Sequence, residues 1–140
     1  MKIMKMGKLQ IFILMSGLVL SLLSCGSSEP APDSISGKEY KITITSGSGA
    51  MSSTGSSIIT FEKSGTYTII GDDVHTTGDT GTYIYKKTGA NTGMVTLTSS
   101  EITEYQETDI FEFTEKSSGK YSAKTTNGEA GEQTGTFYEI

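Results

Sequence analysis

The residues of this 140-residue chain with the most chemical potential are one cysteine, Cys25, one histidine, His75, and two groups of acids. His75 lies among Asp72, Asp73 and Asp79 in a segment between two predicted strands. Carboxylates in a loop can hold Ca²⁺, but their spacing does not match an Asp-x-Asp-x-Asp-Gly loop. A Gly-x-Ser-x-Gly elbow of a serine hydrolase is also missing from the sequence. This segment is typical of a solvated turn, so we predict no metal and no cofactor, and a hydrolase is only the lesser alternative.

A second acidic group follows the end of one predicted strand and includes the start of the next. Its members are Glu101, Glu104, Glu107 and Asp109. Acids at strand ends usually face water, so we expect these four to form a solvated rim.

Eight aromatic residues recur on one face of the predicted strands: Tyr40, Tyr67, Tyr83, Tyr85, Phe111, Phe113, Tyr121 and Phe137. Two interpretations stay open for this face. It is either the hydrophobic core or the lining of a pocket for a small apolar or aromatic ligand.

The net charge excludes one class of partner. The chain carries −5 in total and contains no arginine. Removal of the three lysines within residues 1–24 leaves 8 lysines against 16 acids, a net charge of −8. Nucleic-acid binding needs phosphate neutralisation by Lys and Arg, so we predict no nucleic-acid partner.

The first 24 residues have the organisation of a secretory signal peptide. Lys2, Lys5 and Lys8 precede the apolar run Leu9–Leu23, and small residues follow. The apolar run of about 15 residues is shorter than the roughly 20 needed to span a bilayer as a helix.

The boundary Leu22-Leu23-Ser24-Cys25 resembles the lipobox of bacterial lipoproteins. The resemblance implies cleavage before Cys25 and attachment of fatty acyl chains to that cysteine, which then holds the protein on a membrane. It implies an extracytoplasmic protein of the cell envelope. Gly26 after the cysteine favours the outer membrane if the host has one.

Residues 25–36 are predicted to be the lipidated cysteine and a flexible tether, since they are polar, aperiodic and contain both prolines. Residues 37–140 are predicted to form a single all-β domain. Its sequence is rich in Thr, Tyr, Ile and Gly, and Leu97 is its only leucine. We predict eight strands, near residues 38–45, 57–62, 66–70, 81–87, 94–98, 109–115, 120–124 and 134–139.

Apolar and polar residues alternate in these strands, which favours an antiparallel meander with one buried face. The pattern [Ser/Thr]-Gly-x-[Tyr/Phe] begins at Ser64, Thr80, Ser118 and Thr134, with a spacing of 16 residues within each pair. We interpret this as two related three-strand units, over about residues 57–88 and 109–140. Closure of eight strands into an up-and-down barrel would remove both sheet edges, and a two-sheet sandwich is the alternative.

The opening Gly37-Lys38-Glu39-Tyr40 and the Gly-x-Tyr/Phe strand starts resemble small calycin-like, lipocalin-like barrels. The hairpin at residues 81–98 also resembles a recurring, uncharacterised type of bacterial secreted domain. The resemblance implies a β-barrel that encloses its own side chains or one small ligand.

Two main functions follow from these observations. The first is a membrane-anchored lipoprotein that binds a small lipophilic ligand or an envelope protein. The second is a cell-surface structural module that binds protein or glycan through its exterior. Neither is an enzyme.

Overall fold

The computed structural model describes residues 28–71, 78–126 and 129–140, and within them the chain forms eight β-strands. The strands are β1 (Lys38–Gly49), β2 (Gly55–Phe61), β3 (Thr66–Gly71), β4 (Asp79–Lys87), β5 (Thr92–Ser99), β6 (Gln106–Glu115), β7 (Ser118–Thr125) and β8 (Gly131–Glu139). No helix in this described part is long and apolar enough to cross a membrane. The predicted signal peptide, Cys25, Asp72, Asp73 and His75 lie outside the described residues.

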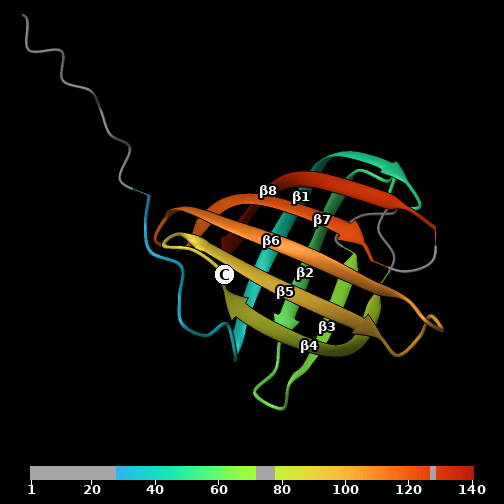
Figure 1. Ribbon diagram of the computed structural model, residues 1–140, viewed down its shortest axis with the longest axis horizontal. Helices are drawn as coiled ribbons and strands as arrows, with labels where there is room; N and C mark the ends of the chain where they lie inside the picture. Colours follow the sequence, from blue (N-terminus) through green and yellow to red (C-terminus); the bar gives the residue numbers. More distant parts are fainter. Residues whose placement is uncertain (1–27, 72–77, 127–128) are drawn as a thin grey trace, which may run out of the picture.

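The eight strands form one closed antiparallel barrel in sequence order, as predicted (Figure 1). Each strand pairs with its neighbour in the chain, and β1 pairs with β8 from Tyr40↔Glu139 to Gly49↔Gly131. This last pairing closes the sheet and leaves no free strand edge. The alternative of a two-sheet sandwich is therefore wrong.

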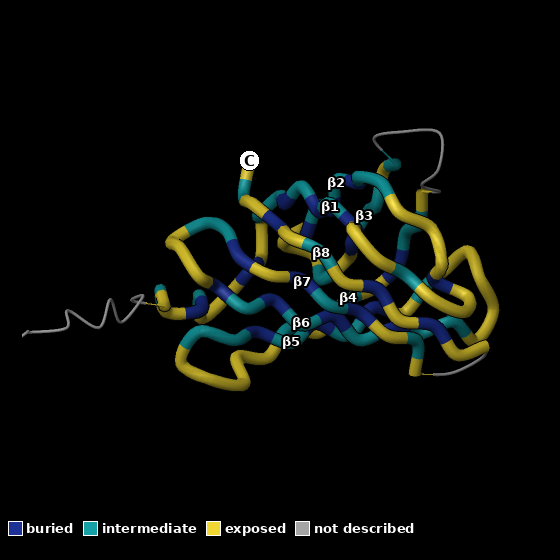
Figure 2. The backbone as a smooth tube through the Cα atoms, turned by 90° about the horizontal axis from the view of Figure 1, so that it is seen from above, coloured by how far each residue is buried: buried dark blue, intermediate teal, exposed yellow. Residues whose placement is uncertain are grey.

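Alternation along the strands decides which side chains fill the barrel. In β6, Glu107, Asp109, Phe111 and Phe113 are buried, whereas the residues between them are more exposed. The same rule holds in β5, where Gly93, Val95 and Leu97 point inward. Buried positions follow the strands and exposed positions gather in the loops at both ends of the barrel (Figure 2).

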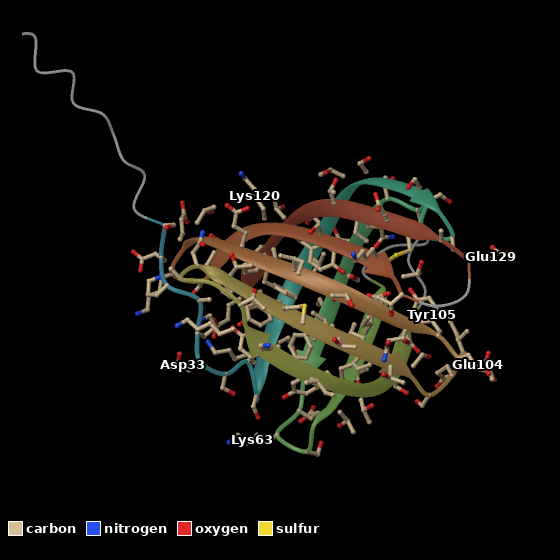
Figure 3. All side chains as sticks on the ribbon, viewed as in Figure 1. Asp33, Lys63, Glu104, Tyr105, Lys120 and Glu129 are labelled. Carbon is tan, nitrogen blue, oxygen red and sulfur yellow. The ribbon has the colours of Figure 1, made fainter. Side chains whose placement is uncertain are left out.

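The two ends of the barrel differ. The end that carries the connections of residues 50–54 and 100–105 is called the mouth end. The end that carries the connections of residues 62–65, 88–91 and 116–117 is called the aromatic end. In Figure 3, Glu104, Tyr105 and Glu129 lie at the mouth end, and Lys120 and Asp33 lie at the opposite side of the molecule.

Part of the predicted tether belongs to the folded domain. Ala31 and Ile35 are each 2% exposed and join the hydrophobic core. The Ala31 amide donates to the Ala90 carbonyl at 2.9 Å, and the Tyr85 hydroxyl donates to the Pro32 carbonyl at 2.6 Å. The predicted boundary at residue 37 is therefore too late, because two isolated apolar residues in a polar segment give no periodic signal. The segment lies along one end of the barrel (Figure 1).

The repeated motif has a structural role in the barrel. Its aromatic residue and the glycine of the next motif face each other across paired strands: Tyr67 opposite Gly81 and Tyr121 opposite Gly135. A Cβ atom at Gly81 or Gly135 would overlap a carbonyl oxygen of a neighbouring strand. Glycine permits this close approach, which strongly bent barrel sheets require. The same pairing of an aromatic residue with a glycine occurs in both halves of the domain. It supports the predicted relation between the three-strand units at about residues 57–88 and 109–140.

Candidate functional site: an acidic cavity at the mouth end

Most of the eight predicted aromatic residues form a packed cluster. Tyr40, Phe111, Phe113 and Phe137 are at most 2% exposed. The Phe111 ring lies 4.9 Å from the Phe137 ring, and the Tyr40 ring lies 5.6 Å from the Phe111 ring, with both pairs tilted or edge-to-face. Such ring pairs are favourable beyond their buried area. This part of the barrel is core, and its rings fill the space that a ligand would need.

The other four tyrosines extend this cluster in two directions. Tyr83 and Tyr85 are partly buried at the aromatic end, and the Tyr83 ring packs 4.9 Å from the ring of Phe61. Tyr67 and Tyr121 are almost fully buried and carry their hydroxyl groups toward the acids of the mouth end. Of the eight residues, Tyr121 lines the cavity described next.

A cavity of about 230 Å³ lies inside the barrel at the mouth end. One wall is apolar and comes from β1, β2, β3 and the β1–β2 connection. The opposite wall is acidic and phenolic and comes from the start of β4, the β5–β6 connection, β6, β7 and β8. The principal apolar residues are Ile42, Ile44, Met51, Ile59 and Ile69, and the principal polar residues are Asp79, Tyr105, Glu107, Asp109, Tyr121 and Gln133.

Two of the three acids in this wall have hydrogen-bond donors. Asp79 accepts from the Tyr67 hydroxyl at 2.5 Å and from the Ser99 hydroxyl at 2.6 Å, so both of its oxygens are bonded. Glu107 is 7% exposed and accepts a hydrogen bond from the Tyr105 hydroxyl. These phenol and hydroxyl groups take the place of water around the two carboxylates.

Asp109 is the exception. Its side chain is completely buried, and neither carboxylate oxygen has a hydrogen-bond partner among the described residues. The Tyr121 hydroxyl and the Glu107 carboxyl are the polar groups that interact with it. Buried carboxyl groups without partners are strongly unfavourable for folding. Within β6, Asp109 separates Glu107, nearer the mouth, from the aromatic Phe111. Asp109 belongs to the lining of the cavity, but neighbouring atoms cover its oxygens, so a molecule that enters there reaches them only when those neighbours shift.

Burial changes the ionisation of this wall. Burial raises the pKa of the Asp109 carboxyl well above its usual range, and the nearby charge of Glu107 adds to the effect. Burial also raises the pKa of Glu107, although the hydrogen bond from Tyr105 acts in the opposite direction. The pKa of Tyr105 is raised by burial and by the charge of Glu107, so this phenol stays a neutral donor.

These positions correct one prediction from the sequence. Glu107 and Asp109 are not part of a solvated rim, whereas Glu101 and Glu104 are exposed as expected. The reason is that β6 begins at Gln106 rather than at the predicted residue 109. Glu107 and Asp109 stand at every second position before Phe111 and Phe113, so their side chains lie on the same face of the strand. This alternation is the sequence signal that would have placed them inside the barrel.

The arrangement suits ligand binding better than metal binding or catalysis. No group of three or more His, Cys, Asp or Glu residues within the described ranges could hold a metal ion. The polar wall offers carboxylate acceptors and phenol donors, and the apolar wall offers a hydrophobic surface. Together they fit a small molecule with one charged or polar end.

No protein-family model matches the chain, and no curated protein matches it in sequence. One solved structure resembles the fold, a protein from Burkholderia vietnamiensis described as a "putative beta-lactamase". The two chains are 12% identical, with a TM-score of 0.54, and the match covers 80% of this chain and 99% of the other. At this identity the similarity concerns the barrel fold alone.

Proposed function

We propose that this chain is a lipid-anchored protein of the bacterial cell envelope that binds a small ligand in the cavity at the mouth end. It acts as a binding protein rather than an enzyme. The lipid on Cys25 would hold it on the extracytoplasmic face of a membrane, with the outer membrane favoured if the host has one. The observation that carries the binding role is the fully buried, unpartnered Asp109 in the cavity wall.

The contents of the barrel define what kind of ligand would fit. The aromatic rings pack against one another at the opposite end, so an elongated lipid would find no space along the barrel axis. A volume of about 230 Å³ lies below the usual range for drug-sized ligands. We therefore replace the expectation of a lipophilic ligand with a compact one that has an apolar body and a polar end.

The position of the anchor supports this proposal. Ala31 and Pro32 are bonded to β4 and to the β4–β5 turn, at the aromatic end. Ala31 stands six positions after Cys25, and even a fully extended chain of that length spans only about 20–22 Å. The lipid would thus hold the aromatic end near the membrane and leave the mouth end facing the aqueous compartment.

Native mass spectrometry of the full lipidated chain, extracted in mild detergent from a bacterial host, tests the proposal. We expect a discrete mass beyond that of the lipidated protein, lost on gentle activation. The Ala50→Trp variant is the matched control, because Ala50 is an exposed residue that lines the cavity, and a large ring there would obstruct it. Masses of both proteins that chain and lipid alone account for, with nothing lost on activation, would contradict ligand binding.

A surface-interaction module is the second candidate. A shallow groove of about 290 Å³ lies on the barrel wall over β6, β7 and β8, and its lining includes Thr108, Ile110, Ser122 and Thr134. Such a groove could accept part of a protein or glycan. We favour the interior cavity, although the groove is slightly larger, because no unpartnered buried polar side chain lines the groove in the described part of the chain.

A further inference from the structure

We propose that the cavity recognises a small organic ammonium ion, whose charged nitrogen lies between Asp109 and Glu107 and whose apolar body lies against the isoleucines of β1 and β2. This inference rests on the proposed function, since it names the class of ligand for the same cavity. Three independent features of the described structure support it: the unpartnered acid, the apolar wall and the distribution of charge.

Asp109 defines the polar end of the ligand. Neither of its oxygens has a hydrogen-bond partner among the described residues, although the Tyr121 hydroxyl and the Glu107 carboxyl interact with this carboxyl group. Glu107, two residues along the same strand, faces the same interior. No lysine belongs to the described lining of the cavity, so the protein provides no cation for these acids. An ammonium group would bring a positive charge and three N–H donors, which a neutral or anionic ligand does not.

The opposite wall defines the rest of the ligand. Ile42 and Ile44 on β1 and Ile59 on β2 line the cavity across from the acids. Ile42 and Ile59 are at most 3% exposed and therefore present a fixed apolar surface. A short branched hydrocarbon body would bury apolar area there, whereas a bare metal ion would leave the wall without a contact.

The charge around the mouth would attract a cation. Seven acids of the described part of the chain lie in the mouth half of the barrel: Asp79, Glu101, Glu104, Glu107, Asp109, Glu129 and Glu132. Among the described lysines, only Lys124 lies in that half. An excess of one sign at a cleft raises the local concentration of the opposite ion and discourages anions. The exposed acids thus steer the ligand, and the buried acids hold it.

The acids are arranged for an ammonium ion rather than a metal ion. Both oxygens of Asp79 are bonded to Tyr67 and Ser99, and Glu107 is bonded to Tyr105. These donors keep Asp79 from joining Asp109 and Glu107 in a common ligand sphere. An ammonium needs only directed acceptors at one end, which Asp109 and Glu107 provide.

The test compares isobutylammonium with isobutanol, its neutral counterpart of the same shape, by NMR titration of the full lipidated protein in detergent. We expect shifts of the cavity amides with both compounds and a dissociation constant at least about tenfold lower for the ammonium. Asp109→Asn should remove this preference, and Glu107→Gln should reduce it. Glu62→Gln, which changes an exposed acid at the aromatic end, should alter the ammonium affinity less than about twofold.

The outcomes separate the inference from the function on which it rests. Equal affinity for isobutylammonium and isobutanol would overturn ammonium recognition while leaving a ligand-binding cavity. Binding of neither compound would overturn the inference, and the native mass of the purified protein then decides the function independently. Tighter binding of Ca²⁺ than of isobutylammonium, lost in Asp109→Asn, would replace the ammonium site with a metal site.

Discussion

At the scale of single residues, the burial of acids inside the barrel disfavours folding. Asp109 lies in a position where an apolar side chain would satisfy the core, between Val95 on β5 and Ala123 on β7. Residues that destabilise the free protein in this way are common at functional sites, because the missing interactions are supplied by the ligand. The stability of a variant at this position is therefore informative about function.

We expect Asp109→Asn to raise the free energy of unfolding by about 1–3 kcal/mol at pH 8, because the amide stays neutral, whereas the buried carboxyl must either carry a charge or be held protonated at that pH. Folding raises the pKa of Asp109, so the stability associated with this group is fully present below its unfolded pKa of about 3.9. That stability is lost as the pH rises through the raised folded pKa. Wild-type stability should therefore fall more steeply than that of the variant between about pH 4 and pH 8.

Urea denaturation at about pH 5 and pH 8 measures this difference. Part of the slope should persist in Asp109→Asn, since the pKa of the buried Glu107 is also raised by burial. A variant less stable than the wild type at pH 8 would mean that Asp109 supports the fold of the free protein, which contradicts a role reserved for a ligand.

At the scale of strands, the glycines of the repeated motif allow the sheet to bend into a barrel. We expect Gly135→Ala to lower the free energy of unfolding by about 1–3 kcal/mol, because its methyl group would overlap the Thr43 carbonyl on β1. Gly89→Ala is the matched control, since a methyl group there would lie 3.5 Å from the Thr92 Cβ atom, an ordinary contact. Its effect should stay within about 0.5 kcal/mol.

Equilibrium urea unfolding of both variants checks this prediction, and the pairing of β1 with β8 can be followed by amide exchange. Equal stability of Gly135→Ala and Gly89→Ala would show that the sheet has room at Gly135 and that the motif glycine has another role. The comparison tests the repeat as well, since Gly81 stands in the equivalent position opposite Tyr67.

The strands were predictable from sequence because their alternation is regular and their turns carry glycine. The start of β6 was not, since Glu107 and Asp109 are charged, and charged residues ordinarily mark the end of a buried strand. The docking of Ala31 and Ile35 was also not predictable, because it depends on a surface that exists only after the barrel closes. Tertiary packing, rather than local preference, decided both features.

At the scale of the whole molecule, the docked segment around Ala31 and Pro32 and the mouth lie at opposite ends of the barrel. The Lys87 ammonium bonds to Asp33 at 3.1 Å, and the Lys38 ammonium pairs with Glu139 at 2.8 Å, both at the aromatic end. The Lys87–Asp33 pair is exposed and adds little to stability. The hydrogen bonds to the backbone of Ala31 and Pro32 fix where the chain leaves the barrel. The proposed lipid on Cys25 would therefore leave the mouth end facing water.

This orientation can be measured because Cys25 is the only cysteine, and acylation would block its thiol. We expect a dye on Lys120→Cys, at the aromatic end, to transfer energy to a bilayer dye more efficiently than one on Glu129→Cys, at the mouth end (Figure 3). The protein must be reconstituted with its own lipid, because the prediction depends on the short distance from Cys25 to Ala31. Adding Cys25→Ser to either variant should abolish fatty-acid labelling and membrane retention. Efficient transfer from Glu129→Cys, with little from Lys120→Cys, would place the mouth against the bilayer and would indicate a ligand taken from the membrane rather than from solution.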